Sequence, residues 1–187
     1  MSGKKALFFC AASSSIDPKY NQAAREAVRA ACLCGYEIVS GGTIKGTMKV
    51  VSDTARECGA RVKGVLPRFM DGLEYPVLDE LVWTDTMADR KEKKREGVCL
   101  AVALPGGIGT LDELAETCTL VRLHQLDAKI VIYNVDGFYD ILERLFDYYV
   151  ETGMLDLPTR RKYVFVRTLD EFKAELLTAT LRDVIVG

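Results

Sequence analysis

The run Val98-Cys-Leu-Ala-Val-Ala-Leu104 is the most apolar stretch of the sequence, and Pro105-Gly-Gly-Ile-Gly109 follows it directly. An apolar run without alternation is typical of a strand that is buried on both faces, as in the centre of a parallel sheet. Glycine-rich positions then interrupt the run, and a helical pattern continues to about His124. We therefore expect a central strand, a glycine loop and a helix in that order.

The same alternation of strand-like and helix-like patterns continues on both sides of this stretch. Strands are expected at residues 6–10, 36–39, 61–66, 81–83, 129–133 and 163–166, and helices at 18–34, 47–58, 87–96, 138–151 and 169–181. Asp17 is expected to cap the first of these helices, with Pro18 at its first position. This alternation predicts an α/β fold, with residues 1–187 forming one Rossmann-like domain that has a mostly parallel sheet and helices on both faces. Ligands of such sheets bind beyond the carboxyl ends of the strands, where the glycine-rich segments 40–46 and 105–109 both fall.

Composition narrows the class of protein and its partners. The chain has 187 residues, 49% of them apolar and 28% charged, as in ordinary globular domains. The formal net charge of −2 gives no reason to expect a nucleic acid or an anionic membrane as a partner.

No signal peptide or transmembrane run is apparent, so we expect a cytoplasmic protein. The six cysteines form no CxxC pair and are expected to be reduced, buried thiols; with a single histidine, His124, neither a metal site nor a cofactor is expected.

The segment from Gly106 to Thr110 is a candidate phosphate site. Glycine lets the backbone approach a ligand closely, and a helix that begins here presents unpaired N–H groups and the positive end of its dipole. The hydroxyl of Thr110 adds a further donor. An ordinary tight turn, in which Thr110 or Asp112 caps the helix, is the alternative interpretation. The other glycine-rich segment, 40–46, lacks the Gly-Lys-Ser/Thr ending of a Walker A loop.

Charged residues on two helices are candidates for chemistry. Glu113 follows the glycine loop by about one helical turn, and Glu116 shares its face. Carboxylates at such positions commonly only complement the helix dipole, but beside a bound phosphosugar one could orient water or stabilise a cationic anomeric carbon. Arg90 opens the helix before the central strand, whereas the basic run 93–95 is expected on a solvated face.

Together these segments resemble the LOG ("lonely guy") family, the cytokinin riboside 5'-monophosphate phosphoribohydrolases. The family pattern Pro-Gly-Gly-x-Gly-Thr-x-x-Glu is matched in full by residues 105–113. The methionine and the Arg-Lys pair that precede it in the family are matched by Met87, Arg90 and Lys91. The resemblance spans about residues 6–155.

The chain departs from the family pattern at three glycines. In the family, glycines are usual at the positions of Thr43, within the glycine-rich segment 40–46, and of Lys49, just after Met48. A glycine is also usual at the position of Ala11, in the loop that follows the first expected strand. These departures leave the expected fold unchanged, and they bear on the choice of substrate.

The resemblance implies hydrolysis of the N-glycosidic bond of an adenosine 5'-monophosphate, which releases the base and ribose 5-phosphate. Cytokinin-type N6-modified AMP is the favoured substrate, and a homodimer is the implied assembly. Glu113 and Arg90 are the implied catalytic pair. The implied substrate-binding residues are Lys91, Gly106, Gly107, Ile108, Gly109, Thr110, Asp112, Glu116, Ser13 and Gly42.

A non-catalytic nucleotide or molybdenum cofactor carrier is the alternative function, because proteins resembling that carrier share this fold and a similar glycine loop. A carrier has no need for both Arg90 and Glu113, so their joint presence favours an enzyme. The label "lysine decarboxylase", which similar sequences sometimes carry, requires a pyridoxal phosphate lysine in a larger scaffold. The sequence offers no context for such a lysine.

Overall fold

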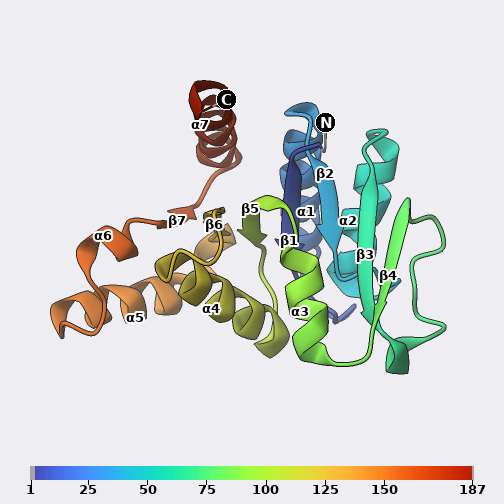
Figure 1. Ribbon diagram of the computed structural model, residues 1–187, viewed down its shortest axis with the longest axis horizontal. Coiled ribbons are helices and arrows are strands. Elements are labelled where there is room, and N and C mark those ends of the chain that lie inside the picture. The colour runs from blue at the N-terminus through green and yellow to red at the C-terminus, as the bar shows by residue number, and fades with distance from the viewer. Residues whose placement is uncertain (1–2, 187) are drawn as a thin grey trace.

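The chain forms one seven-stranded sheet in which every strand pair is parallel (Figure 1). The computed structural model describes residues 3–186 and the surroundings of side chains through residue 178. The strand order is β4-β3-β2-β1-β5-β6-β7. The strands are β1 (Lys5–Phe9), β2 (Glu37–Ser40), β3 (Val62–Pro67), β4 (Glu80–Thr84), β5 (Val98–Ala103), β6 (Lys129–Tyr133) and β7 (Tyr163–Val166).

Helices cover both faces of this sheet, as the alternating pattern predicts. One face carries α1 (Pro18–Leu33), α2 (Gly46–Glu57) and α7 (Leu169–Val186), and the other carries α3 (Met87–Arg95), α4 (Ile108–Arg122) and α5 (Asp140–Glu151) (Figure 1). Each face has its own apolar core. Phe8 and Val102 contribute to the first core, and Phe9 and Ala103 to the second, because successive side chains of a strand point to opposite faces.

Strand β5 confirms the expectation for the apolar run. It lies beside the middle strand β1, and its residues from Leu100 to Ala103 are buried on both faces of the sheet. The strand order reverses between these two strands, since β1 continues to β2 on one side whereas β5 continues to β6 on the other. Such a reversal separates the loops that follow the two strands and opens a crevice at their carboxyl ends.

The helix signals in the sequence also agree with the structure. Asp17 caps α1 with its side chain, which accepts a hydrogen bond from the Lys19 amide, and Pro18 occupies the first turn. Three short elements were not expected: α6 (Leu157–Arg160) and the two 3-10 turns η1 (Arg68–Met70) and η2 (Val135–Gly137). Elements of three or four residues are too short to give a periodic pattern.

Gly46 brings the second glycine-rich loop against the first loop of the sheet. Its φ is +53°, and a Cβ at this position would come within 2.7 Å of the backbone of Ala11, Ala12 and Ser13. The Thr47 amide then donates to the Ala11 carbonyl at 3.0 Å. The loops after β1 and β2 are therefore locked together on one side of the crevice.

The cysteines and the helices also bear on what the composition predicts about thiol burial and membrane spans. All six cysteines are free, as expected, but only Cys118 is fully buried and the other five are partly exposed, so the expectation of buried thiols holds in full for Cys118 alone. Within residues 3–186, no helix combines the length and the apolar character that a membrane crossing requires.

Candidate active site

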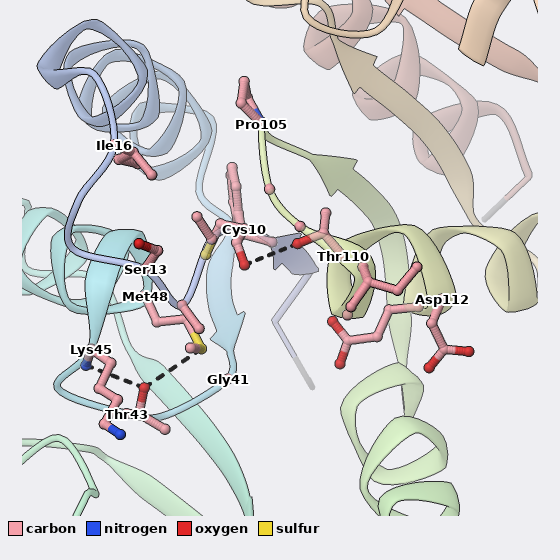
Figure 2. Close-up of a pocket in the computed structure, with 18 of the residues that line it drawn as sticks. Cys10, Ser13, Ile16, Gly41, Thr43, Lys45, Met48, Pro105, Thr110 and Asp112 are labelled. Atoms are coloured by element: carbon pink, nitrogen blue, oxygen red, sulfur yellow. Dashed lines mark hydrogen bonds between the residues drawn. The ribbon is translucent and has the colours of Figure 1, made fainter. Parts of the chain in front are cut away.

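A cavity of about 650 Å³ lies at the carboxyl ends of the strands, where the order of the sheet reverses. The segments after β1, β2, β3 and β5 contribute to its lining, and Figure 2 shows Ser13 and Thr43 from the first two and Thr110 from the start of α4. The apolar side chains of its lining include Met48, Met70, Leu73 and Met87, and the charged ones include Arg90, Lys94 and Glu113.

The glycine loop after β5 places the start of α4 at this cavity. Gly107 caps the helix without any side-chain hydrogen bond, so the first-turn amides of α4 have no side-chain acceptor at the cap. A Cβ at Gly107 or Gly109 would meet no atom within 4 Å, which leaves open space beside these amides. An uncapped helix start with free space in front of it suits an anion such as phosphate.

Gly106 and Thr110 serve a different purpose in the same loop. A Cβ at Gly106 would lie 2.2 Å from Thr110 Oγ1, so glycine is required for the close approach. The Thr110 hydroxyl donates to the Cys10 carbonyl at 3.0 Å, a bond drawn in Figure 2. This hydroxyl therefore ties the start of α4 to the end of β1.

Arg90, Lys94 and Glu113 form what we call the inner cluster. Arg90 Nη1 lies 3.3 Å and Lys94 Nζ 2.7 Å from the same carboxylate oxygen, Glu113 Oε1. The three side chains are 8%, 3% and 10% exposed, respectively. A carboxylate on α4 is thus held between two cations from α3 inside the cavity. The structure brings together the two residues that the family resemblance implies as catalytic.

Arg90 is fixed by three acceptors. Besides Glu113, its Nε donates to the Val65 carbonyl at 2.8 Å and its Nη2 to the Gly41 carbonyl at 3.2 Å. Gly41 permits this approach, because a Cβ there would lie 2.8 Å from Arg90 Nη2. Burial lowers the pKa of Arg90, and Glu113 opposes that change. The guanidinium starts from so high a pKa that it remains charged at neutral pH.

Lys94 is the charged residue that sequence analysis missed. The basic run 93–95 was expected on a solvated face, and this expectation is wrong for Lys94 and Arg95, which are both buried. Burial lowers the pKa of Lys94, whereas Glu113 raises it. The signal that could have identified Lys94 is its spacing, because a residue four positions after Arg90 lies on the same helix face.

Cys10, the residue directly after β1, lines the same cavity as the inner cluster. Burial raises the pKa of its thiol to about 12, and Lys94 opposes that change. The thiol is therefore protonated at neutral pH and contributes no negative charge beside Glu113.

A second set of ion pairs joins the same two helices, and we call Lys91, Arg95, Asp112 and Glu116 the outer cluster; of these four residues, Asp112 lines the cavity and the other three do not. Lys91 Nζ lies 3.1 Å from Asp112 Oδ2 and 2.8 Å from Glu116 Oε2, and Arg95 Nη2 lies 2.9 Å from Glu116 Oε1. The side-chain hydrogen bond with Glu116 raises the pKa of Lys91. Desolvation raises the pKa of Glu116, but the hydrogen bonds from Lys91 and Arg95 outweigh it and lower that pKa.

Most of the residues predicted to bind substrate line the cavity, and three do not. The lining includes Ser13, Gly106, Gly107, Ile108, Gly109, Thr110 and Asp112. Lys91 and Glu116 belong to the outer cluster, and Gly42 packs against β3, where a Cβ would lie 2.8 Å from Gly64 Cα. Their roles in binding stay predictions. The residues that line the cavity without having been expected include Lys45, Met70, Leu73 and Lys94.

The described residues contain no group of three or more histidine, cysteine or acidic side chains that could hold a metal ion.

The parallel sheet and the cavity at its reversal point define an α/β protein of the Rossmann-like class. Solved structures support this fold. A molybdenum cofactor binding protein from Rippkaea orientalis superposes with a TM-score of 0.70 over 95% of this chain and 98% of its own, at 18% identity. The molybdenum cofactor carrier protein of Chlamydomonas reinhardtii also gives a TM-score of 0.70, over 95% of this chain and 99% of its own, at 15% identity. The expected carrier-like fold is confirmed.

Sequence comparisons identify the family. Residues 48–176 match the family model described as "possible lysine decarboxylase". The cytokinin riboside 5'-monophosphate phosphoribohydrolase LOG5 of Arabidopsis thaliana is 33% identical over 87% of this chain and 72% of its own. The probable phosphoribohydrolase LOGL3 of Oryza sativa is 31% identical over 92% of this chain and 83% of its own. The chain belongs to the LOG family of cytokinin riboside 5'-monophosphate phosphoribohydrolases.

Proposed function

We propose that this protein hydrolyses the N-glycosidic bond of an adenosine 5'-monophosphate and releases the free base and ribose 5-phosphate. N6-modified AMP of the cytokinin type is the favoured substrate, by analogy with the named relatives. One observation carries the proposal: Glu113 lies between Arg90 and Lys94 in a cavity whose wall is the uncapped start of α4. A carrier needs the helix start alone, whereas hydrolysis also needs the carboxylate.

The phosphate, the ribose and the base of the substrate are proposed to contact different residues of this site. The 5'-phosphate binds the amides at the start of α4, where space lies in front of Gly107 and Gly109. This places the ribose near Glu113, one helical turn further on. The adenine and its N6 substituent extend toward the apolar lining of Met48, Met70, Leu73 and Met87.

Glu113 is proposed to act on the attacking water. As the bond between C1' and the base breaks, positive charge develops on the ribose, and a nearby carboxylate stabilises it. The water oxygen forms the new bond to C1', and the proton that it loses passes through Glu113 to the departing base. Arg90 orients Glu113 and polarises the substrate by charge-assisted hydrogen bonds.

The test is to incubate the purified protein with AMP and with N6-isopentenyl-AMP and to measure free base and ribose 5-phosphate. Release of both products in equal amounts supports the proposal. If no nucleoside 5'-monophosphate yields free base while nucleotide still binds, the carrier function replaces the proposed one.

The location of the phosphate has its own test in Gly107→Ala. The new methyl group meets no protein atom within 4 Å, so the thermal stability of the free protein should remain unchanged. It does occupy the space in front of the helix start, so the Kd for AMP should rise about tenfold or more, equivalent to about 1.4 kcal/mol or more. Calorimetric titration measures the Kd. An unchanged Kd would place the phosphate elsewhere.

We also propose that the whole chain acts as one domain in the cytoplasm and assembles as a homodimer. The support for a dimer is an apolar stripe on α5, formed by Ile141, Leu145 and Tyr148, which are exposed at helical spacing. Light scattering at micromolar concentration tests the assembly, and a monomer would contradict it.

The description "possible lysine decarboxylase" is not the activity proposed here. That reaction needs a lysine that forms a Schiff base with pyridoxal phosphate. The buried lysine of the cavity, Lys94, is instead ion-paired with Glu113 at 2.7 Å.

A further inference from the structure

We propose that Lys94 is a positioning residue, which fixes Glu113 through one carboxylate oxygen and favours the ionised form of that carboxylate within the buried inner cluster. The inference rests on the proposed function, because it assigns Glu113 the part of the carboxylate that acts on water. It adds a residue of the basic run that the family motif does not include.

The geometry separates the two oxygens of Glu113. Both cations of the inner cluster contact Oε1, Lys94 at 2.7 Å and Arg90 at 3.3 Å. Oε1 therefore holds the carboxylate in place, and Oε2 is the oxygen available to a water molecule or to the ribose. Lys94 makes the shorter of the two contacts, and its side chain is only 3% exposed, so solvent screens the contact little.

Lys94 depends on this contact. Among the described residues, Glu113 is the only hydrogen-bond acceptor of its ammonium group, which also lies 5.2 Å from the centre of the Phe9 ring. A buried lysine loses hydration, and a single ion pair offsets that cost only in part. In contrast, Arg90 has two backbone carbonyls in addition to Glu113, so the position of Arg90 does not depend on the carboxylate alone.

Arg90 and Lys94 are the cations that face the carboxylate of Glu113. Both lie on α3, and Cys10 faces the carboxylate from the end of β1 as a neutral thiol, since burial raises the pKa of that thiol to about 12. The acidic neighbours on α4 itself, Asp112 and Glu116, are paired with residues of the outer cluster. A buried carboxylate that loses one of two cations takes up a proton more readily, because burial disfavours its charged form.

The test replaces Lys94 by methionine, which has a similar length and no charge. In Lys94→Met the acid limb of the profile of kcat against pH should move to higher pH by about one unit, a tenfold change in proton affinity. On the plateau above that limb kcat should recover but stay below the parent value, by about tenfold or less, because Glu113 is ionised there but less firmly held, while KM stays within about threefold. A residue that only supports the fold would lower activity at every pH and would leave the limb in place.

The neighbouring lysine supplies the matched control. Lys93 lies on the same helix, its side chain is 46% exposed, and it pairs with Glu96. Lys93→Met removes the same charge from the solvated face, so its pH profile should coincide with that of the parent. If Lys94→Met does not fold, Lys94→Gln is the second neutral variant, and it must show the same shift of the acid limb. An unshifted limb in the folded neutral variant overturns the proposal.

A readout without turnover separates this inference from the proposed function. Carbon-13 NMR titration of glutamate carboxyl carbons, with Glu113 assigned through Glu113→Gln, measures its protonation in parent and variant. A higher titration midpoint in Lys94→Met supports the inference even if the parent protein releases no base, in which case only the proposed function fails. If base is released but both the midpoint and the acid limb stay unchanged, the role of Lys94 is wrong and the proposed function stands.

Discussion

The inner and outer clusters join the same two helices with the same kinds of residue, yet they lie in different surroundings. Arg90 and Lys94 face the cavity from α3, and each is followed in the sequence by a basic residue of the outer cluster, Lys91 and Arg95. The carboxylate of the inner cluster is 10% exposed, whereas Asp112 and Glu116 of the outer cluster are 57% and 33% exposed.

This difference in burial decides what each cluster can do. Solvent reaches both carboxylates of the outer cluster and screens their pairs, although Arg95 itself is buried, and such pairs typically contribute 0 to about 1 kcal/mol to stability. In the inner cluster the attraction is stronger, and each charged group is costly if it loses its partner. The inner cluster therefore suits chemistry on a bound ligand, and the outer cluster suits the attachment of α3 to α4. The predictions below test this division of roles.

The largest effect is expected for Glu113→Gln. Glutamine keeps the shape of the side chain and removes its charge, so nucleotide binding should survive while kcat falls by about 10²–10⁴-fold, the usual contribution of a general acid–base group. Initial rates of base release and the Kd for AMP measure the two effects separately.

The outer cluster provides the control for that experiment. Glu116→Gln makes the same chemical change one helical turn away on the same face of α4. If Glu113→Gln hydrolyses nucleotide as fast as the parent protein, Glu113 is not the catalytic carboxylate and the distinction between the clusters fails.

The next largest effect is expected for Arg90→Ala. This change removes three hydrogen bonds, to Glu113, Val65 and Gly41, and leaves the loop after β2 without its anchor to α3. Turnover should fall and KM should rise, by about tenfold or more each, because hydrogen bonds to charged groups contribute about 1.5–3 kcal/mol.

Steady-state kinetics give kcat and KM for Arg90→Ala, in the inner cluster, and for Arg95→Ala, in the outer cluster. Arg95 lies on the same helix but belongs to the outer cluster, where it pairs with Glu116 at 2.9 Å. Arg95→Ala should keep kcat and KM within about threefold of the parent. Equal losses in the two variants would mean that both act through the fold of α3 and α4.

Sequence alone predicted the sheet well because its signals are local. The apolar run from Val98 marks a strand buried on both faces, and the pair Asp17 and Pro18 marks a helix start, as the structure confirms. The short α6 and the two 3-10 turns could not be predicted, since their backbone is set by the tertiary contacts of a few residues rather than by periodicity.

The site was predicted only where a motif names its residues. Arg90 and Glu113 lie together in the cavity, as the family resemblance implies, although their roles stay predictions. Lys94 escaped prediction because a lysine within a basic run normally points to solvent. Its burial comes from the packing of α3 against Phe9 and Glu113, two residues from distant parts of the chain. The run 93–95 by itself does not contain that information, and only the four-residue spacing from Arg90 indicates that Lys94 shares its helix face.

The smallest effect is expected for the outer cluster itself. At pH 7, Glu116→Gln should lower the free energy of unfolding by 0 to about 1 kcal/mol, because Lys91 and Arg95 lose a partner that is one-third exposed. Its hydrogen bonds to these residues lower the pKa of Glu116 from the usual 4.5, against the effect of desolvation. A carboxylate with a lowered pKa in the folded state contributes its stability above its usual pKa and loses it as the pH falls through the folded value.

The difference in unfolding free energy between the parent and Glu116→Gln should therefore be present at pH 7 and shrink toward zero as the pH falls below 4.5. Urea denaturation at pH 7 and at a series of lower pH values measures it, since Glu116 of the parent protein becomes a neutral carboxyl group as the pH falls through its folded pKa. The kinetic constants of this variant should stay within about threefold of the parent. A large rise in KM would instead place Glu116 and its partner Lys91 in the substrate site, as the family resemblance implies, and the two clusters would then form one functional unit.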